Sequence, residues 1–179
     1  MPQAAKQVAS QILSLHGERV ILPNTAVAEI IPYIKPDALS DAIGKSAPDW
    51  LLGMIAWRGI SVPLISIETI FGGRYEQQGK RSSIAIINAA DEAAGVPYFA
   101  IVTQGIPRLL QVSADTLSAI DETGDDNKAV ACHVVLDGDV AVIPDMDEVE
   151  AMLKDAFTAS PKKKSSAKKK TKASSKKKK

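Results

Sequence analysis

The side chains best suited to catalysis are few in this chain. The sequence holds two histidines, His16 and His133, and one cysteine, Cys132. His133 follows Cys132 directly within an expected strand, where successive side chains point to opposite faces, so local geometry cannot make them a thiol–imidazole pair. A zinc site needs about four ligands from Cys, His or carboxylates, and the supply here is too small. We therefore expect no catalytic residue, no metal and no cofactor.

A glycine-containing stretch and a large set of carboxylates offer two further kinds of chemistry. Residues 73–80 superficially resemble a phosphate-binding loop, but five residues instead of four separate its glycines, and Arg81 stands where Ser or Thr is required after Lys80. Many carboxylates lie in expected loops and on the polar side of an expected helix. That placement favours a solvated acidic face over general acid–base catalysis. An acid–base enzyme therefore ranks third among the functional classes.

The elements that must position any site are mostly short segments rich in Val and Ile, which favours strands over helices. Turn signals such as Asp137-Gly138 separate them. Many short strands with few helices between them indicate a mainly β protein built of small antiparallel barrels or a sandwich. We expect ten strands, at residues 11–15, 19–23, 27–31, 52–57, 61–66, 83–88, 98–103, 108–112, 131–136 and 139–144.

One helix is indicated near the end of this region. Asp145 is suited to the N-cap, with Glu148 three residues later as in a capping box. Apolar residues then recur at helical spacing, which predicts a helix over about residues 146–157 docked on the core. We also expect short turns at 68–71 and 115–120, and loops at 36–48 and 121–128.

The charge of the chain is unevenly distributed. The 179 residues include 22 Lys and Arg against 21 Asp and Glu, a formal net charge of +1. Residues 160–179 hold 11 lysines and no acid, which leaves the rest with a net charge of −10. A segment of Lys, Ser, Ala, Thr and Pro alone cannot form a core. We therefore expect a domain at residues 1–158 and a disordered Lys-rich tail at 159–179.

Localisation follows from what the sequence lacks. No apolar run approaches the roughly 20 residues of a membrane span, and the first 20 residues do not have the pattern of a secretory signal. A single cysteine fits a reducing compartment. We expect a cytoplasmic protein without direct membrane insertion.

The most informative stretch is a pair of strongly apolar segments separated by Arg58 and Gly59. Such a separation places the two residues at a tight turn, where Gly59 can supply a positive φ and Arg58 is left at the rim. Pro63 inside the second segment indicates an edge strand or a bulge. By composition alone, this would be a core hairpin with an incidental surface arginine.

Several segments together resemble the CheW-like domain of bacterial chemotaxis coupling proteins over roughly residues 10–157. They are Ile21-Leu-Pro-Asn24, Val27-Ala-Glu29-Ile-Ile31, Pro48-Asp-Trp-Leu-Leu-Gly53, Trp57-Arg-Gly59 and Val62-Pro-Leu-Ile65, with the strands expected at 83–88, 98–103, 131–136 and 139–144 downstream. The wording of the first and third segments is most similar to CheW-type proteins of chemosensory systems that govern type IV pili and twitching motility. The resemblance implies two adjacent five-stranded antiparallel β-barrels of SH3-like form, with a C-terminal helix.

The resemblance also implies a function without catalysis. Proteins of this family act as scaffolds that couple the cytoplasmic tip of a methyl-accepting receptor to the regulatory domain of a CheA-type histidine kinase, in some cases in receptor arrays near the cell pole. In the family, the positions of Arg58 and Glu29 lie in partner-binding surface. Val27 and Gly59 adjoin them, and apolar residues around a groove between the lobes would include Ile60 and Ile84. One position departs from the family pattern, because Ser66 stands where many coupling proteins have Asp.

The Lys-rich tail lies outside the resemblance and leaves three interpretations open. These are a solvated segment that screens the acidic body, contact with an acidic partner or other polyanion, and nonspecific attachment to DNA. The tail has no aromatic residue or Arg for stacking or base reading, so any nucleic-acid binding would ignore sequence. A nucleic-acid-associated protein is thus the main alternative to a signalling adaptor, although phosphate repels a body of net charge −10.

Overall fold

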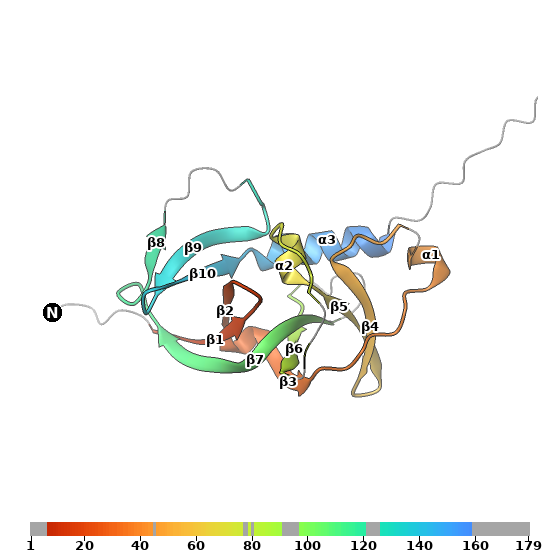
Figure 1. Cartoon of the computed structure of the whole chain (residues 1–179), viewed down its shortest axis with the longest axis horizontal. Helices are drawn as coiled ribbons and strands as arrows, with labels where there is room; N and C mark the ends of the chain where they lie inside the picture. Colours follow the sequence, from red (N-terminus) through yellow and green to blue (C-terminus); the bar gives the residue numbers. More distant parts are fainter. Residues whose placement is uncertain are drawn as a thin grey trace, which may run out of the picture.

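The computed structural model describes residues 7–44, 46–76, 79, 81–90, 97–120 and 126–158. These ranges form a mainly β fold (Figure 1). Its strands are β1 (Val8–Ser14), β2 (Arg19–Pro23), β3 (Val27–Pro32), β4 (Leu51–Trp57), β5 (Ile60–Ile65), β6 (Ser82–Asn88), β7 (Tyr98–Val112), β8 (Ser118–Ile120), β9 (Val130–Leu136) and β10 (Asp139–Pro144). The helices are η1 (Asn24–Ala26), α1 (Asp41–Gly44), α2 (Ile67–Ile70) and α3 (Met146–Thr158).

The strands form one continuous mixed sheet that builds two lobes. Its main path runs β3-β6-β7-β1-β2-β10-β9-β8, and the β4–β5 hairpin joins it through β5 and β7. The first lobe holds β3, β4, β5, β6 and the start of β7, and the second holds β1, β2, β8, β9, β10 and the end of β7. Gln104 lies where β7 passes from one to the other, since it pairs with Ser82 of β6 and with Ser14 of β1.

The expected mainly β class is confirmed, and the sheet corrects its detail. Two pairings, β5 with β7 and β2 with β10, are parallel, whereas only antiparallel pairs were expected. Long connections separate both pairs along the chain, which is what parallel alignment requires. The two lobes also share β7, because the strands expected at 98–103 and 108–112 are one strand of 15 residues. Gly105 in its middle has a φ of +68°.

The first lobe is closed by a close crossing of two segments. Asp37, in the segment after β3, exchanges two backbone hydrogen bonds with Met54 of β4, at N–O distances of 2.8 and 3.0 Å. Gly53 has a φ of +144°, and a Cβ at this position would lie 2.3 Å from the carbonyl oxygen of Asp37. The crossing therefore requires glycine at position 53.

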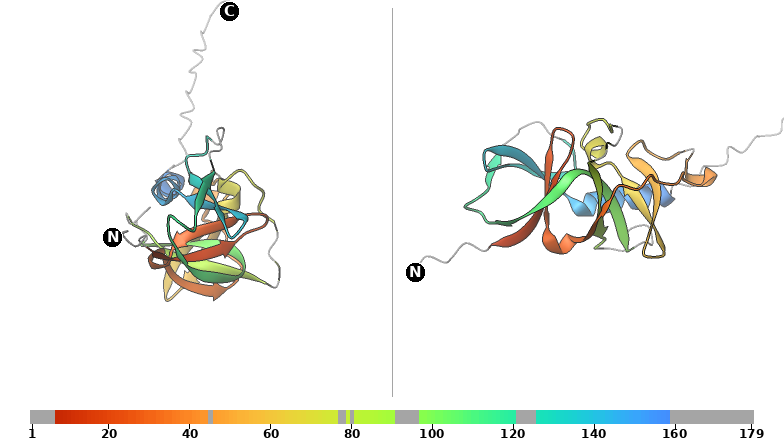
Figure 2. Two further views of the ribbon diagram at one scale, coloured as in Figure 1. Left: turned by 90° about the vertical axis from the view of Figure 1, so that its left-hand side faces the viewer. Right: turned by 60° about the horizontal axis from the view of Figure 1, so that its bottom comes forward.

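Three apolar clusters fill this architecture. One, including Ile55, Trp57 and Ile84, fills the first lobe, and another, including Ile12 and Val134, fills the second. The largest joins residues of both lobes to the buried face of α3. Figures 1 and 2 show α3 running from the end of β10 along the lobe that contains β4 and β5.

The helices agree with the sequence in part. The predicted cap of α3 is confirmed, because the backbone N–H of Glu148 donates to a carboxylate oxygen of Asp145 at 3.1 Å. The turn expected at 68–71 is α2. The region expected as a turn at 115–120 contains a turn and then the short strand β8, and α1 lies in the region expected as a loop. Most of the loop expected at 121–128 and the whole tail expected at 159–179 lie outside the described residues.

Candidate partner-binding surface

The turn between β4 and β5 presents Arg58 to solvent. Trp57 and Ile60 are the last paired residues, so Arg58 and Gly59 form a two-residue turn, with φ of +47° and +81°. Positive φ at both positions is the type I′ geometry that suits the twist of a β-hairpin. A left-handed conformation costs a residue other than glycine roughly 1 kcal/mol or more. The chain thus places a long cation at this tip against its backbone preference.

Glu29 reaches the same place from β3. The ladder between β3 and β6 shifts register between Val27, which pairs with Ile87, and Glu29, which pairs with Ile86. Carboxylate Oε2 of Glu29 lies 2.9 Å from Nη2 of Arg58. The two side chains are 37% and 68% exposed, respectively. The structure therefore brings together the two charged residues that the resemblance indicated.

Trp57 contacts both members of this ion pair, and sequence reasoning assigned it no role. Its indole N–H donates to Oε2 of Glu29 at 2.9 Å, and its ring lies 4.9 Å from the guanidinium carbon of Arg58. Tyr98 packs edge-on against the indole, with ring centroids 4.9 Å apart and an interplanar angle of 66°. The sequence signal was available: an aromatic residue directly precedes the Arg-Gly turn.

The remaining predicted positions differ in their access to solvent. Gly59 and Ile60 are exposed beside Arg58. Val27 is half-buried against the central core, the largest cluster, which joins both lobes to α3. Ile84 has no exposed surface, because it lies in the middle strand of β3-β6-β7 and points into the first lobe. It supports the site from below, and we leave it out of the surface that a partner could touch.

A groove opens where β7 passes between the lobes. Its volume is about 700 Å³, and its walls come from β3, β6 and the middle of β7: Ile30, Ile31, Pro32, Arg81, Ser82, Ser83, Gly105 and Ile106. Ile106 is 89% exposed, and Leu109, further along β7, is also exposed. The resemblance implied a groove between the lobes, but neither Ile60 nor Ile84, the residues assigned to it, lines this one.

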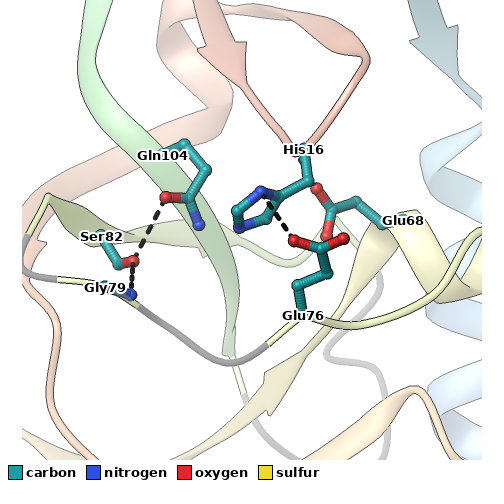
Figure 3. Close-up of polar contacts among 6 residues, drawn as sticks. All are labelled: His16, Glu68, Glu76, Gly79, Ser82 and Gln104. Carbon is teal, nitrogen blue, oxygen red and sulfur yellow. Dashed lines mark hydrogen bonds and ion pairs between the residues drawn. The ribbon is translucent and has the colours of Figure 1, made fainter.

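His16 lies in the turn between β1 and β2, whereas Cys132 and His133 lie in β9. The backbone N–H of His16 donates to Glu68 of α2, and its ring Nδ1 lies 3.5 Å from Oε2 of Glu76 (Figure 3). These contacts tie the β1–β2 turn of the second lobe to the first. Cys132 is a half-buried free thiol in β9, next to His133. Within the ranges that the structure describes, no group of three or more His, Cys, Asp or Glu residues is arranged to hold a metal ion.

Comparison with known proteins agrees with this architecture. The structure is that of a two-lobed β protein whose lobes share one strand, β7, with a charged hairpin tip and an open groove. Residues 11–153 match the family model of the CheW-like domain, so the chain belongs to the CheW-like domain family. Family membership and fold support a scaffold or adaptor of the chemotaxis type.

A solved structure shows the same fold at low sequence identity. The scaffolding protein TtCheW from Thermoanaerobacter tengcongensis superposes with a TM-score of 0.63 at 17% identity, covering 78% of this chain and 89% of that chain. A comparison with curated protein sequences gave no match. Among the described residues, no helix is both long and apolar enough to cross a bilayer.

Proposed function

We propose that this protein is a non-catalytic adaptor that couples a methyl-accepting receptor to a CheA-type histidine kinase. The observation that carries the proposal is the Arg58–Glu29 pair at the tip of an exposed hairpin, in a chain that belongs to the CheW-like domain family. Complementary charges across an interface fix the orientation of a docked partner and exclude wrong ones. We assign this tip, with Gly59, Ile60 and the edge of Val27, to the kinase regulatory domain.

The groove beside β7 suits the receptor. A receptor tip is a helical hairpin, and an amphipathic helix binds by laying its apolar face in an apolar groove. Ile30, Ile31 and Ile106 offer such a face, and Arg81 at the rim can meet an acidic side chain. The tip and the groove are neighbours, because Glu29 and Ile30 follow each other on β3, so we propose that the two partners meet on adjoining surfaces of one chain.

The setting of the adaptor is part of the proposal. The Ile21–Asn24 and Pro48–Gly53 segments support a system that governs type IV pili and twitching motility, and we place the protein in the cytoplasm, at receptor arrays. We set the domain boundary after residue 158, because α3 ends at Thr158 and only Lys, Ser, Ala, Thr and Pro follow.

Charge reversal at the hairpin tip tests the proposal. Arg58→Asp places a carboxylate beside Glu29, so we expect the affinity for the kinase regulatory domain to fall about a hundredfold or more. Circular dichroism should be unchanged, because the Arg58 side chain is largely exposed. The matched control is Arg19→Asp, which reverses a partly exposed arginine paired with Asp139 at 2.5 Å in the second lobe. Unchanged affinity in Arg58→Asp contradicts the proposal.

The charge split of the sequence supports a second, separate role. The 11 lysines of residues 160–179 give a region that attracts polyanions, joined to a body of net charge −10 that repels them. We propose that this tail adds nonspecific contact with a polyanion to the adaptor, and that DNA is the polyanion to test first.

A further inference from the structure

We propose that Trp57 is the positioning residue of the partner-binding tip: it holds Glu29, and through Glu29 and its own ring it holds the guanidinium of Arg58. This inference rests on the proposed function, since it assumes that Arg58 meets a partner. It adds a residue, a donor atom and a physical reason for the orientation of that arginine.

One carboxylate oxygen connects the three side chains. The indole N–H of Trp57 and Nη2 of Arg58 both lie 2.9 Å from Oε2 of Glu29. An exposed Arg–Glu pair is usually weak, because water screens it and two long side chains must be ordered to form it. The indole is different, since only 8% of Trp57 is exposed and the ring is fixed by packing. The buried donor thus anchors one end of an otherwise mobile pair.

Packing around the indole keeps that anchor in place. Tyr98 packs against its ring, and the apolar core of the first lobe surrounds it with β-branched and leucine side chains. An aromatic side chain has only two rotatable side-chain bonds, so ordering it costs little conformational entropy. The N–H therefore points to the surface from a rigid base, and Glu29 is the described group that accepts it.

Arg58 is then held on two sides. Its guanidinium lies over the indole face at 4.9 Å, a cation–π contact, and one of its nitrogens pairs with Glu29. A guanidinium has five N–H donors in a planar fork, so most of them remain directed away from these contacts. Fixing the fork before binding lowers the entropy that association loses. A partner carboxylate would meet an arginine that is already oriented.

The geometry can be tested without any partner. The chain has two tryptophans, so ¹⁵N spectra show two indole N–H signals, and Trp50→Phe assigns them. We expect Glu29→Ala to move the Trp57 signal upfield and to speed its exchange with water. Trp57→Phe should raise the mobility of the Arg58 side-chain N–H. An unchanged Trp57 signal in Glu29→Ala, or an equally rigid Arg58 in Trp57→Phe, overturns the positioning role.

Binding measurements test its consequence. Trp57→Phe keeps an aromatic ring in the core and removes the donor, and we expect about tenfold weaker binding of the kinase regulatory domain. In the Glu29→Ala background, the same substitution should add almost nothing, because the acceptor is already gone. Trp50→Phe is the control: Trp50 is also buried, but in the central core, and its loss should leave the affinity unchanged.

An isosteric analogue separates the N–H from the packing. In the Trp50→Phe background, Trp57 is replaced by an analogue with sulfur in place of the indole N–H. The analogue keeps the fused two-ring shape, so it still tests the N–H if Trp57→Phe disturbs the core. We expect the same weakening as in Trp57→Phe. If both substitutions keep full affinity while Arg58→Asp loses it, the positioning role is wrong and the proposed function stands. If Arg58→Asp itself keeps full affinity, the proposed function is wrong, and the spectra still decide whether Trp57 orders Arg58.

Discussion

Arg58 occupies a position at which the backbone favours a different residue. The first residue of a type I′ turn is best filled by Asn, Asp or Gly, yet this chain places an arginine there at a φ of +47°. The ion pair with Glu29 and the contact with Trp57 offset part of that cost. Strain retained at an exposed tip is expected where the side chain has a binding role.

This conflict gives a prediction at the residue scale. Arg58→Asn relieves the backbone and removes the ion pair and the cation–π contact, terms of about 1 kcal/mol each. We expect the free energy of unfolding in urea to stay within about 1 kcal/mol of the wild type, while kinase binding falls at least tenfold. A large loss of stability would instead assign Arg58 a structural role.

Ser66 shows how a departure from the family pattern can leave local structure intact. Its hydroxyl oxygen accepts the backbone N–H of Thr69 at 3.3 Å and so caps α2. Asp and Ser are both favoured N-cap residues because each offers an oxygen to the same orphan donors. The substitution therefore preserves the hydrogen bond that opens the helix after β5.

The sequence predicted which residues belong to the site better than it predicted their contacts. Arg58 and Glu29 were found through resemblance, and a family pattern cannot give their 2.9 Å contact. Trp57 was visible in the sequence, but only the fold shows its N–H reaching a strand 28 residues away. Ile84 was also assigned through the resemblance, and a family pattern does not show that its side chain is buried in the core of the first lobe.

Among the elements, the β4–β5 hairpin depends most on one residue. Gly53→Ala forces a Cβ against the backbone oxygen of Asp37 and the Cβ of Pro36, neither of which is the end of a flexible side chain. It also imposes a positive φ on alanine. We expect a loss of about 3 kcal/mol or more in the free energy of unfolding. The matched control is Gly138→Ala, with a φ of +85° and open space around its Cβ, which should cost about 1 kcal/mol. Equal losses in urea titrations would contradict the close crossing.

Strand existence was predictable, and strand connection was not. Runs of Val and Ile bounded by turn residues located nearly all the strands, because side-chain packing on a pleated surface depends on local sequence. Gly105 and Pro107 look like a break, yet β7 continues through them and joins the lobes. Strand β8 has three residues, too few for any periodic signal. The parallel pairings depend on long-range contacts that no local pattern records.

For the whole molecule, the separation of charge predicts how the chain meets DNA. Removing residues 160–179, so that the chain ends at Ala159, should abolish DNA retention and leave kinase binding unchanged. With the tail present, log K should fall steeply and linearly with log salt, whatever the DNA sequence. Replacing the tail lysines with arginine should retain DNA, and replacing them with serine should not. Equal retention with and without residues 160–179 removes the DNA proposal.

The proposed adaptor joins two other proteins without chemistry of its own. The most direct measurement is sedimentation of the kinase regulatory domain with receptor-bearing membranes, in the presence of the wild type, Arg58→Asp or Arg19→Asp. We predict that the wild type and Arg19→Asp carry the kinase domain into the pellet. Arg58→Asp should itself sediment with the receptor and leave the kinase domain in solution. Recovery of the kinase domain with Arg58→Asp at the wild-type level, or no recovery with the wild type, would contradict the proposed coupling function.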